Sequence, residues 1–129
     1  DKATRFIFQR LPEYIATDSA QLYDARNTQG DLIAFDVAEI GARNYAFYMF
    51  NVCPRKANFP GASDLLLAYI IEQAQAQGKR YLNLGLGIHP GIQFFKQKWG
   101  GDAFLKHFNY SKNTGQSAAP WNTVDSFLR

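Results

Sequence analysis

Residues able to transfer protons lie in the second half of the sequence. His89 stands in the loop Gly87–Gly91, which follows a predicted strand at Tyr81–Leu84. Ligands of α/β proteins bind beyond the carboxyl ends of strands, and an imidazole gains and loses its proton near neutral pH. Tyr110 carries a phenol that can act as a general acid. The sequence therefore contains candidates for acid–base catalysis, although a loop histidine and a packed tyrosine also occur without catalytic roles.

A second chemical feature is the distribution of positive charge. The chain has 14 Lys and Arg against 11 Asp and Glu, and this net charge of +3 is too small to indicate DNA binding. Between residues 79 and 112, however, Asp102 is the only acid. The bases of this basic run are Lys79, Arg80, Lys96, Lys98, Lys106 and Lys112. We expect an anionic ligand such as a phosphate-bearing cofactor, with solvated helix and strand faces as the alternative interpretation.

Other reactive side chains give weaker signals. Asp36 and Glu39 can accept a proton from an amine, but both lie on a predicted strand whose alternation should expose its polar face. Cys53 precedes Pro54 and has no base beside it in the sequence, so we expect a small buried residue. The chain's two histidines and this cysteine are too far apart to have metal-site spacing.

Composition indicates one folded domain. The chain has 129 residues, of which 47% are hydrophobic and 16% aromatic. No apolar run reaches the ~20 residues that span a bilayer, and no signal-peptide pattern is present. A single cysteine excludes an internal disulfide, which indicates a reducing compartment, and we predict a cytoplasmic protein. Because the sequence begins with Asp1 rather than Met, it can be a fragment or one half of a longer protein.

Periodicity predicts the elements that position these residues. Strands are predicted at Thr4–Phe8, Ala20–Arg26, Leu32–Ile40, Tyr45–Val52, Tyr81–Leu84 and Ala103–Tyr110. Helices are predicted from an N-cap at Ser63 to a C-cap at Gly78, and from Gly91 to Trp99 with Ile92, Phe95 and Trp99 as a buried stripe. Since a helix connects them, strands 45–52 and 81–84 should be parallel neighbours, and the apolar character of 45–52 predicts burial on both sides.

The order of these elements over residues 19–110 resembles the GNAT (Gcn5-related N-acetyltransferase) superfamily. The run Gly78–Gly85 (Gly-Lys-Arg-Tyr-Leu-Asn-Leu-Gly), followed by Gly91-Ile92 and Phe95–Gly101, is similar to its FemAB-type, lysyltransferase-like branch. The resemblance implies an α/β acyl-CoA N-acyltransferase fold, in which helices flank a mixed, mostly antiparallel sheet with a splayed parallel pair. Residues 1–110 would form this domain, and residues 111–129 a loose C-terminal tail.

The resemblance also implies a cofactor site. In this superfamily acyl-CoA lies between the splayed strands, and backbone N–H groups at the start of the long helix hold its pyrophosphate. The corresponding residues here are Val52, Arg55, Lys56, Gly61, Ala62 and Ser63. The superfamily's loop pattern contains a glycine and ends, two residues later, in a second glycine or an alanine. Whether Gly61 or Ala62 is taken as its last residue, this sequence has no glycine at the earlier position, and Pro60 removes one N–H donor. Aminoacyl-tRNA, the donor of the FemAB-type branch, is therefore the alternative to acyl-CoA, and no metal is expected.

The activity that the resemblance implies is direct transfer of an acyl or aminoacyl group to the amine of a small molecule or peptide. Lys96 matches a lysine linked to acyl transfer in the FemAB-type branch and would stabilise the oxyanion. The alternative is that Lys96 is only an exposed lysine on a helix. Tyr110 and His89 are the other catalytic candidates. Only residues 9–18 remain for the superfamily's two front helices. A homodimer partner or an upstream tandem domain would then complete the acceptor site, or the domain would be non-catalytic and serve ligand binding or dimerisation.

Overall fold

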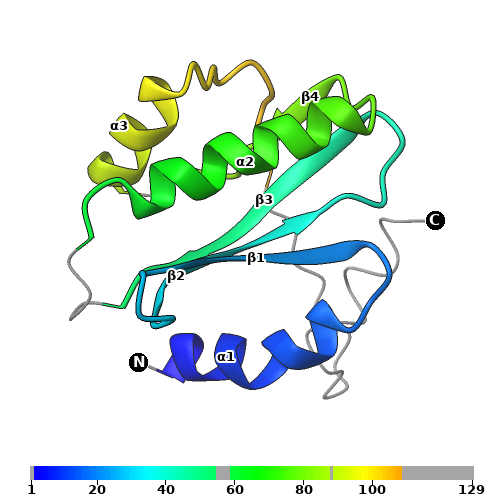
Figure 1. Ribbon diagram of the computed structural model, residues 1–129. Helices are drawn as coiled ribbons and strands as arrows, with labels where there is room; N and C mark the ends of the chain where they lie inside the picture. The colour runs from blue at the N-terminus through cyan, green and yellow to red at the C-terminus, as the bar shows by residue number, and fades with distance from the viewer. Residues whose placement is uncertain (1, 55–58, 88, 109–129) are drawn as a thin grey trace.

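The computed structural model describes residues 2–54, 59–87 and 89–108. Its elements in chain order are α1 (Lys2–Ile15), β1 (Ala20–Arg26), β2 (Leu32–Glu39), β3 (Tyr45–Val52), α2 (Ala62–Ala76), β4 (Tyr81–Asn83) and α3 (Pro90–Lys98). The strands form one sheet with α1 on one face and α2 on the other, and α3 lies beside α2 (Figure 1). The predicted α/β class is confirmed.

The sheet combines antiparallel and parallel pairing in the predicted way. Its order is β1-β2-β3-β4, with β1 antiparallel to β2, β2 antiparallel to β3, and β3 parallel to β4. A parallel pair needs a long connection, which α2 provides, whereas short turns join the first three strands. The predicted parallel neighbours are present, and the three preceding strands form an antiparallel meander.

β3 parts from β4 after three paired positions. The pairs are Tyr45 with Tyr81, Ala46 with Leu82 and Phe47 with Asn83, and β3 then continues to Val52. On the other side of β3 the register with β2 shifts, because Val37 lies opposite Phe50 while Ala38 lies opposite Tyr48. Met49 is therefore the extra residue of a β-bulge. Bulges bend and twist a strand locally, so this one helps β3 to diverge from β4.

The core has one part on each side of the sheet. Toward α2, Ala25 and Ala34 pack with Ala62 and Leu66. The buried residues of α2 are Ala62, Leu66, Leu67, Ile70 and Ala74, and their helical spacing places them on one face. Burying each of the larger ones contributes about 1.5–3 kcal/mol. Toward α1, the buried residues are Leu11, Ala20 and Val37.

The first element differs from the prediction, because Thr4–Phe8 lies within α1 rather than in a strand. Its aromatic and β-branched residues resemble a strand locally, but helical spacing brings Leu11 and Ile15 onto the sheet. Pro12 lies inside the helix. A helix of 14 residues therefore stands where the sequence predicted a strand.

The other errors concern the edge beyond β4. Residues 103–108 form no strand, and Tyr110 and the predicted tail lie outside the described residues. β4 is three residues long and offers little edge for another strand to pair with. No residue of α3 is buried; Phe95 and Trp99 are half-buried and Ile92 is exposed. The prediction that β3 is buried on both sides was also wrong, because Tyr45 and Met49 are exposed although β3 lies inside the sheet.

Within the described residues, no helix combines the length and apolar surface that crossing a membrane requires.

Candidate functional site

The edge of β3 that faces β4 is open after Phe47. β4 pairs only with Tyr45–Phe47, and within the described chain no strand pairs with this edge from Tyr48 to Val52. Backbone N–H and C=O groups are strong hydrogen-bonding groups, so this open edge can bind a carbonyl-containing ligand. Val52, a predicted cofactor residue, ends the open edge and lies half-buried opposite Phe35.

Lys96 lies where β3 and the chain after β4 separate. Its Nζ donates a 2.7 Å hydrogen bond to the Leu86 carbonyl oxygen. A Cβ placed on Gly85 would lie 3.8 Å from Lys96 Nζ and 3.9 Å from the Tyr48 carbonyl oxygen. Burial lowers the pKa of Lys96 below its ordinary value. The Lys96 ammonium therefore lies next to Gly85, which also adjoins the first residue of the open edge, and from there it can stabilise negative charge.

The start of α2 has the features of an anion site. The N-cap is Gly61 with a φ of 85°, a left-handed conformation that favours glycine, and no side-chain hydrogen bond caps the helix. The predicted cap, Ser63, was wrong because its hydroxyl bonds to Asn51 instead. The N–H of Ala62 reaches the Phe59 carbonyl oxygen at 3.3 Å. The remaining first-turn N–H groups and the helix dipole favour an anion here.

Asp64, in the first turn of α2, joins this helix to α3. Its Oδ1 accepts hydrogen bonds of 2.7 Å from Lys98 Nζ and from Trp99 Nε1. The hydrogen bond from Lys98, followed by that from Trp99, lowers the pKa of Asp64. An unpaired carboxylate at this helix end would repel a bound anion, and the Lys98 charge offsets that repulsion.

A polar network missed by the sequence analysis links β2, β3 and α2. Asp36 is fully buried, although the alternation of its strand predicted exposure. Its Oδ1 accepts a 2.5 Å hydrogen bond from Asn51 Nδ2, which also donates to Ser63 Oγ at 3.1 Å. Burial raises the pKa of Asp36 to about 6, against the lowering effect of Asn51 and then of Tyr48. Only the position of Asp36, between Phe35 and Val37, hinted at burial.

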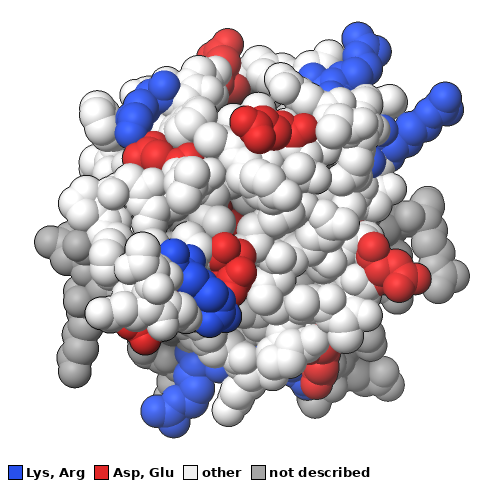
Figure 2. All heavy atoms as spheres, viewed as in Figure 1, with Lys and Arg blue, Asp and Glu red and all other residues white. Residues whose placement is uncertain are grey.

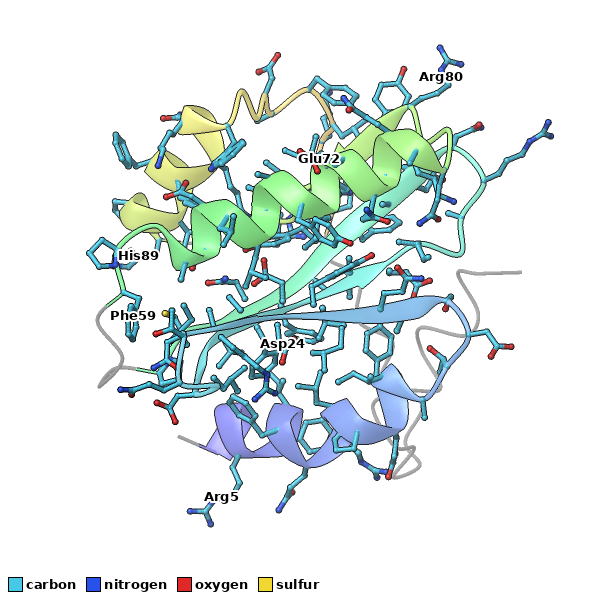
Figure 3. The ribbon with its side chains drawn as sticks, in the orientation of Figure 1. Arg5, Asp24, Phe59, Glu72, Arg80 and His89 are labelled. Carbon is cyan, nitrogen blue, oxygen red and sulfur yellow. The ribbon has the colours of Figure 1, made fainter. Side chains whose placement is uncertain are left out.

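The remaining predicted site residues do not gather at the open edge. His89 is exposed, and its Nδ1 accepts a 3.1 Å hydrogen bond from the Gly91 N–H, so it caps α3. Figure 3 shows His89 at the end of the molecule where α2 begins, and Arg80 at the opposite end. Arg55, Lys56 and Tyr110 lie outside the described residues.

The basic run does not form one patch in the described part of the chain. Lys79 Nζ bonds to the carbonyl oxygens of Ile40 and Ala42, both at 2.7 Å, and Lys96 and Lys98 have the partners given above. On the face that Figure 2 shows, charged side chains are scattered and separated by uncharged surface. The charges of the run thus serve local contacts more than a shared anion surface.

An apolar pocket lies on the α1 side of β3. Its volume is about 360 Å³, and α1 contributes Ile7, Leu11 and Tyr14 while β3 contributes Met49 and Phe50. The two β3 residues belong to the open edge, so the pocket adjoins it from the face opposite α2.

A pair of charges stands beside this pocket. Arg10 and Glu13 line it and form an exposed ion pair of 2.8 Å. On the same face Tyr14 donates a 2.9 Å hydrogen bond to Glu39 Oε2. Burial, followed by this hydrogen bond, raises the pKa of Tyr14.

Two further expectations concern reactive side chains. Cys53 is exposed rather than buried, and its Sγ lies 3.4 Å from the Ile33 carbonyl oxygen. It lies at the end of β3, where the core no longer covers the strand. No group of three or more potential metal ligands occurs within the described residues.

Comparison with known proteins identifies the fold. No protein-family model matches the sequence, and no curated protein matches it. Among solved structures, an aminoglycoside N-acetyltransferase in complex with CoA has 18% sequence identity and a TM-score of 0.65, over 87% of this chain and 92% of that one. The ribosomal-protein-alanine N-acetyltransferase of Brucella melitensis has 14% identity and a TM-score of 0.66, over 79% and 78%. A GNAT family acetyltransferase of Elizabethkingia anophelis with acetyl-CoA bound has 22% identity and a TM-score of 0.60, over 77% of this chain and 61% of that one. The fold is that of the GNAT acetyltransferases.

Proposed function

We propose that this chain is an N-acyltransferase domain that takes its acyl group from acyl-CoA and transfers it to an amine. The observation that carries the proposal is the meeting of two ligand-binding features at one place. The open edge Tyr48–Val52 lies beside the uncapped start of α2, to which Asn51 bonds directly through Ser63. The CoA and acetyl-CoA complexes of acetyltransferases with the same fold support this choice of donor.

The residues present fit such a cofactor. Acyl-CoA would supply a thioester, whose carbonyl carbon an amine can attack directly; the new C–N bond replaces the C–S bond, CoA leaves as the thiol, and the proton of the amine passes to the departing sulfur or to solvent. Backbone N–H groups of Gly61 and Ser63 would hold its pyrophosphate, because a helix start with a glycine cap leaves room and donors for an anion. The Ala62 N–H would join them on leaving the Phe59 carbonyl oxygen, to which it now bonds at 3.3 Å. Backbone groups of the open edge would orient the acyl carbonyl, and Lys96 would add positive charge near its oxygen.

The acceptor would enter from the opposite face of the sheet. The apolar pocket between α1 and β3 adjoins the open edge through Met49 and Phe50. Apolar and aromatic walls favour an amine with an apolar body, such as an arylalkylamine or a peptide with an apolar first residue. The exposed pair Arg10–Glu13 at this pocket is suited to contacts with polar ends of such a molecule.

Thermal unfolding with CoA and acetyl-CoA tests the donor. At a hundredfold excess over the dissociation constant, binding adds about 2.7 kcal/mol, which raises the Tm by on the order of 10 °C in a domain of this size. Ser63→Asp is the matched variant, since an acid in the first turn favours the helix but repels a pyrophosphate. The proposal predicts a saturable rise for the parent chain and a much smaller one for Ser63→Asp.

Other results would contradict this assignment. No rise with millimolar CoA or acetyl-CoA would exclude acyl-CoA as the donor. A rise that Ser63→Asp retains in full would show that CoA binds elsewhere. If acetyl-CoA binds, release of CoA thiol from acetyl-CoA in the presence of apolar amines measures acyl transfer and identifies the acceptor class.

A non-catalytic role in association is the second candidate. The observation that favours it is apolar exposure near and beyond α3, where Phe94, Phe104 and Leu105 are each more than two-thirds exposed. Under this alternative the chain would form dimers in sedimentation experiments and would show no thiol release with any amine.

A further inference from the structure

A buried acid connects the two halves of the proposed cofactor site. Asp36 on β2 is 0% exposed, and it accepts a 2.5 Å hydrogen bond from Asn51 on the open edge. Asn51 exchanges hydrogen bonds of 3.1 and 3.2 Å with the hydroxyl of Ser63 in the first turn of α2. We call Asp36, Asn51 and Ser63 the tether. It runs from the middle of the sheet to the turn proposed to hold pyrophosphate.

The tether is costly for folding. Asp36 Oδ2 and the Tyr48 hydroxyl are both buried, and neither makes a hydrogen bond of regular geometry within the described residues, although the two groups face each other. A buried carboxylate without full hydrogen bonding destabilises the native state, and an apolar residue of similar size is often at least as stable. Stability of the sheet alone therefore gives no reason for an acid at this position.

We propose that Asp36 is a positioning residue, which acts through Asn51 and Ser63 to hold the open edge of β3 and the start of α2 at the separation that one CoA molecule spans. This inference rests on the proposed function. Asp36 itself is buried and touches no ligand. Its effect is to fix the Asn51 side chain, and thereby the distance between the strand that binds the acyl carbonyl and the turn that binds phosphate.

This arrangement has a specific energetic consequence. A ligand that bridges two subsites gains affinity only when the subsites stand at the spacing of its two ends. Breaking the tether should therefore weaken the binding of whole CoA, which contacts both subsites. It should leave almost unchanged the binding of a fragment that contacts one subsite. Loss of a residue that only stabilised the fold would weaken the binding of CoA and of its fragments to the same extent.

The experiment compares CoA, adenosine 3′,5′-bisphosphate and acetyl-pantetheine as ligands of the full chain. Asn51→Ala removes both links of the tether at an exposed position, so folding should persist. Asp36→Leu breaks the tether from its buried end without leaving an unpaired charge. Calorimetry for CoA and NMR titration for the two fragments give the dissociation constants. In both variants we expect the Kd of CoA to rise about tenfold, as for the loss of one hydrogen bond to a charged group. Each fragment should change less than twofold.

Asn27→Ala is the matched control. Asn27 is an asparagine of the β1–β2 turn whose side chain bonds to Asp31 and to the Gln29 N–H. Its loss should lower stability and leave the Kd of CoA unchanged. Unaltered CoA binding in Asn51→Ala, or equal weakening of CoA and both fragments, would overturn the inference while the proposed function stands. Failure of the parent chain to bind CoA would refute the proposed function and the inference with it.

Discussion

The buried carboxyl of Asp36 leads to a quantitative prediction about stability. Desolvation by burial raises its pKa to about 6, although Asn51 and then Tyr48 act to lower it. In the unfolded chain an aspartate has a pKa near 3.9. On raising the pH, the native state therefore loses this proton about 2 pH units later than the unfolded state, that is, near pH 6 rather than near pH 4. Asp36→Asn keeps the shape of the side chain and removes the titration.

The sign of the effect follows from which state loses its proton first. Below about pH 4 Asp36 is protonated in both states, so its contribution is constant. Between about pH 4 and 6 the unfolded state binds fewer protons than the native state, and the free energy of unfolding falls as the pH rises. At 1.36 kcal/mol per unit, the loss amounts to about 3 kcal/mol by pH 7.

Neighbouring groups do not hide this change. From β3, Tyr48 faces Asp36, and burial followed by the Asp36 charge raises its pKa, so it stays neutral in this range. From α2, the charge of Asp64 acts on Tyr48, and its hydrogen bonds lower the pKa of Asp64 itself. That shift has the opposite sign: it stabilises the native state above about pH 4 and is lost in acid. Because Asp64 is present in parent and variant alike, its contribution cancels in their difference.

Urea unfolding of the parent chain and of Asp36→Asn between pH 4 and 7 measures that difference. We expect the variant to gain stability relative to the parent as the pH rises, with a total change of about 3 kcal/mol that is complete near pH 7. NMR titration of the Asp36 carboxyl carbon gives the pKa independently. Parallel stability curves for the two proteins, or a carboxyl that titrates near pH 4 in the native state, would refute the reasoning.

Three further substitutions test other contacts. Lys96→Gln should lower kcat of acyl transfer by about a hundredfold, the usual cost of losing one oxyanion-stabilising group, with an unchanged Kd of CoA in calorimetry; an unchanged kcat would remove Lys96 from the reaction. Lys79→Ala loses two hydrogen bonds to the carbonyl oxygens of Ile40 and Ala42, so urea unfolding should show a loss of about 1–3 kcal/mol. Gly61→Ala forces a side chain into a left-handed conformation and should cost about 1 kcal/mol in the same assay; a stability gain would contradict the assigned backbone.

The parts of the fold that the sequence predicts are those with strong periodicity and clear turns. Strands Ala20–Arg26 and Tyr45–Val52 have the predicted bounds, and α2 forms where a helix was predicted between Ser63 and Gly78. The parallel pairing followed from chain connectivity, since a helix of this length joins neighbouring parallel strands. These features depend on local pattern and on topology rules, and both can be obtained from one sequence.

The errors come from packing, which one sequence does not contain. Thr4–Phe8 has the composition of a strand, but Leu11 and Ile15 gain more by packing a helix against β1 and β2. Residues 103–108 alternate, but β4 leaves them little edge to pair with. Asp36 was expected at the surface because its strand alternates, whereas α2 covers that face of the sheet and buries it.

The features of this chain that depart most from regular structure lie close together. The bulge at Met49, the left-handed Gly61 and the buried Asp36, whose Oδ2 lacks a regular hydrogen bond, all lie around the second half of β3 and the start of α2, and the pairing of β4 stops just before the bulge. The bulge interrupts the β2–β3 ladder, the buried carboxyl costs stability, and Gly61 leaves the start of α2 without a side-chain cap. Departures of this kind are expected where a structure serves binding or catalysis. A chain selected only to associate through α3 would have no reason to keep them, and this favours the transferase over the non-catalytic alternative.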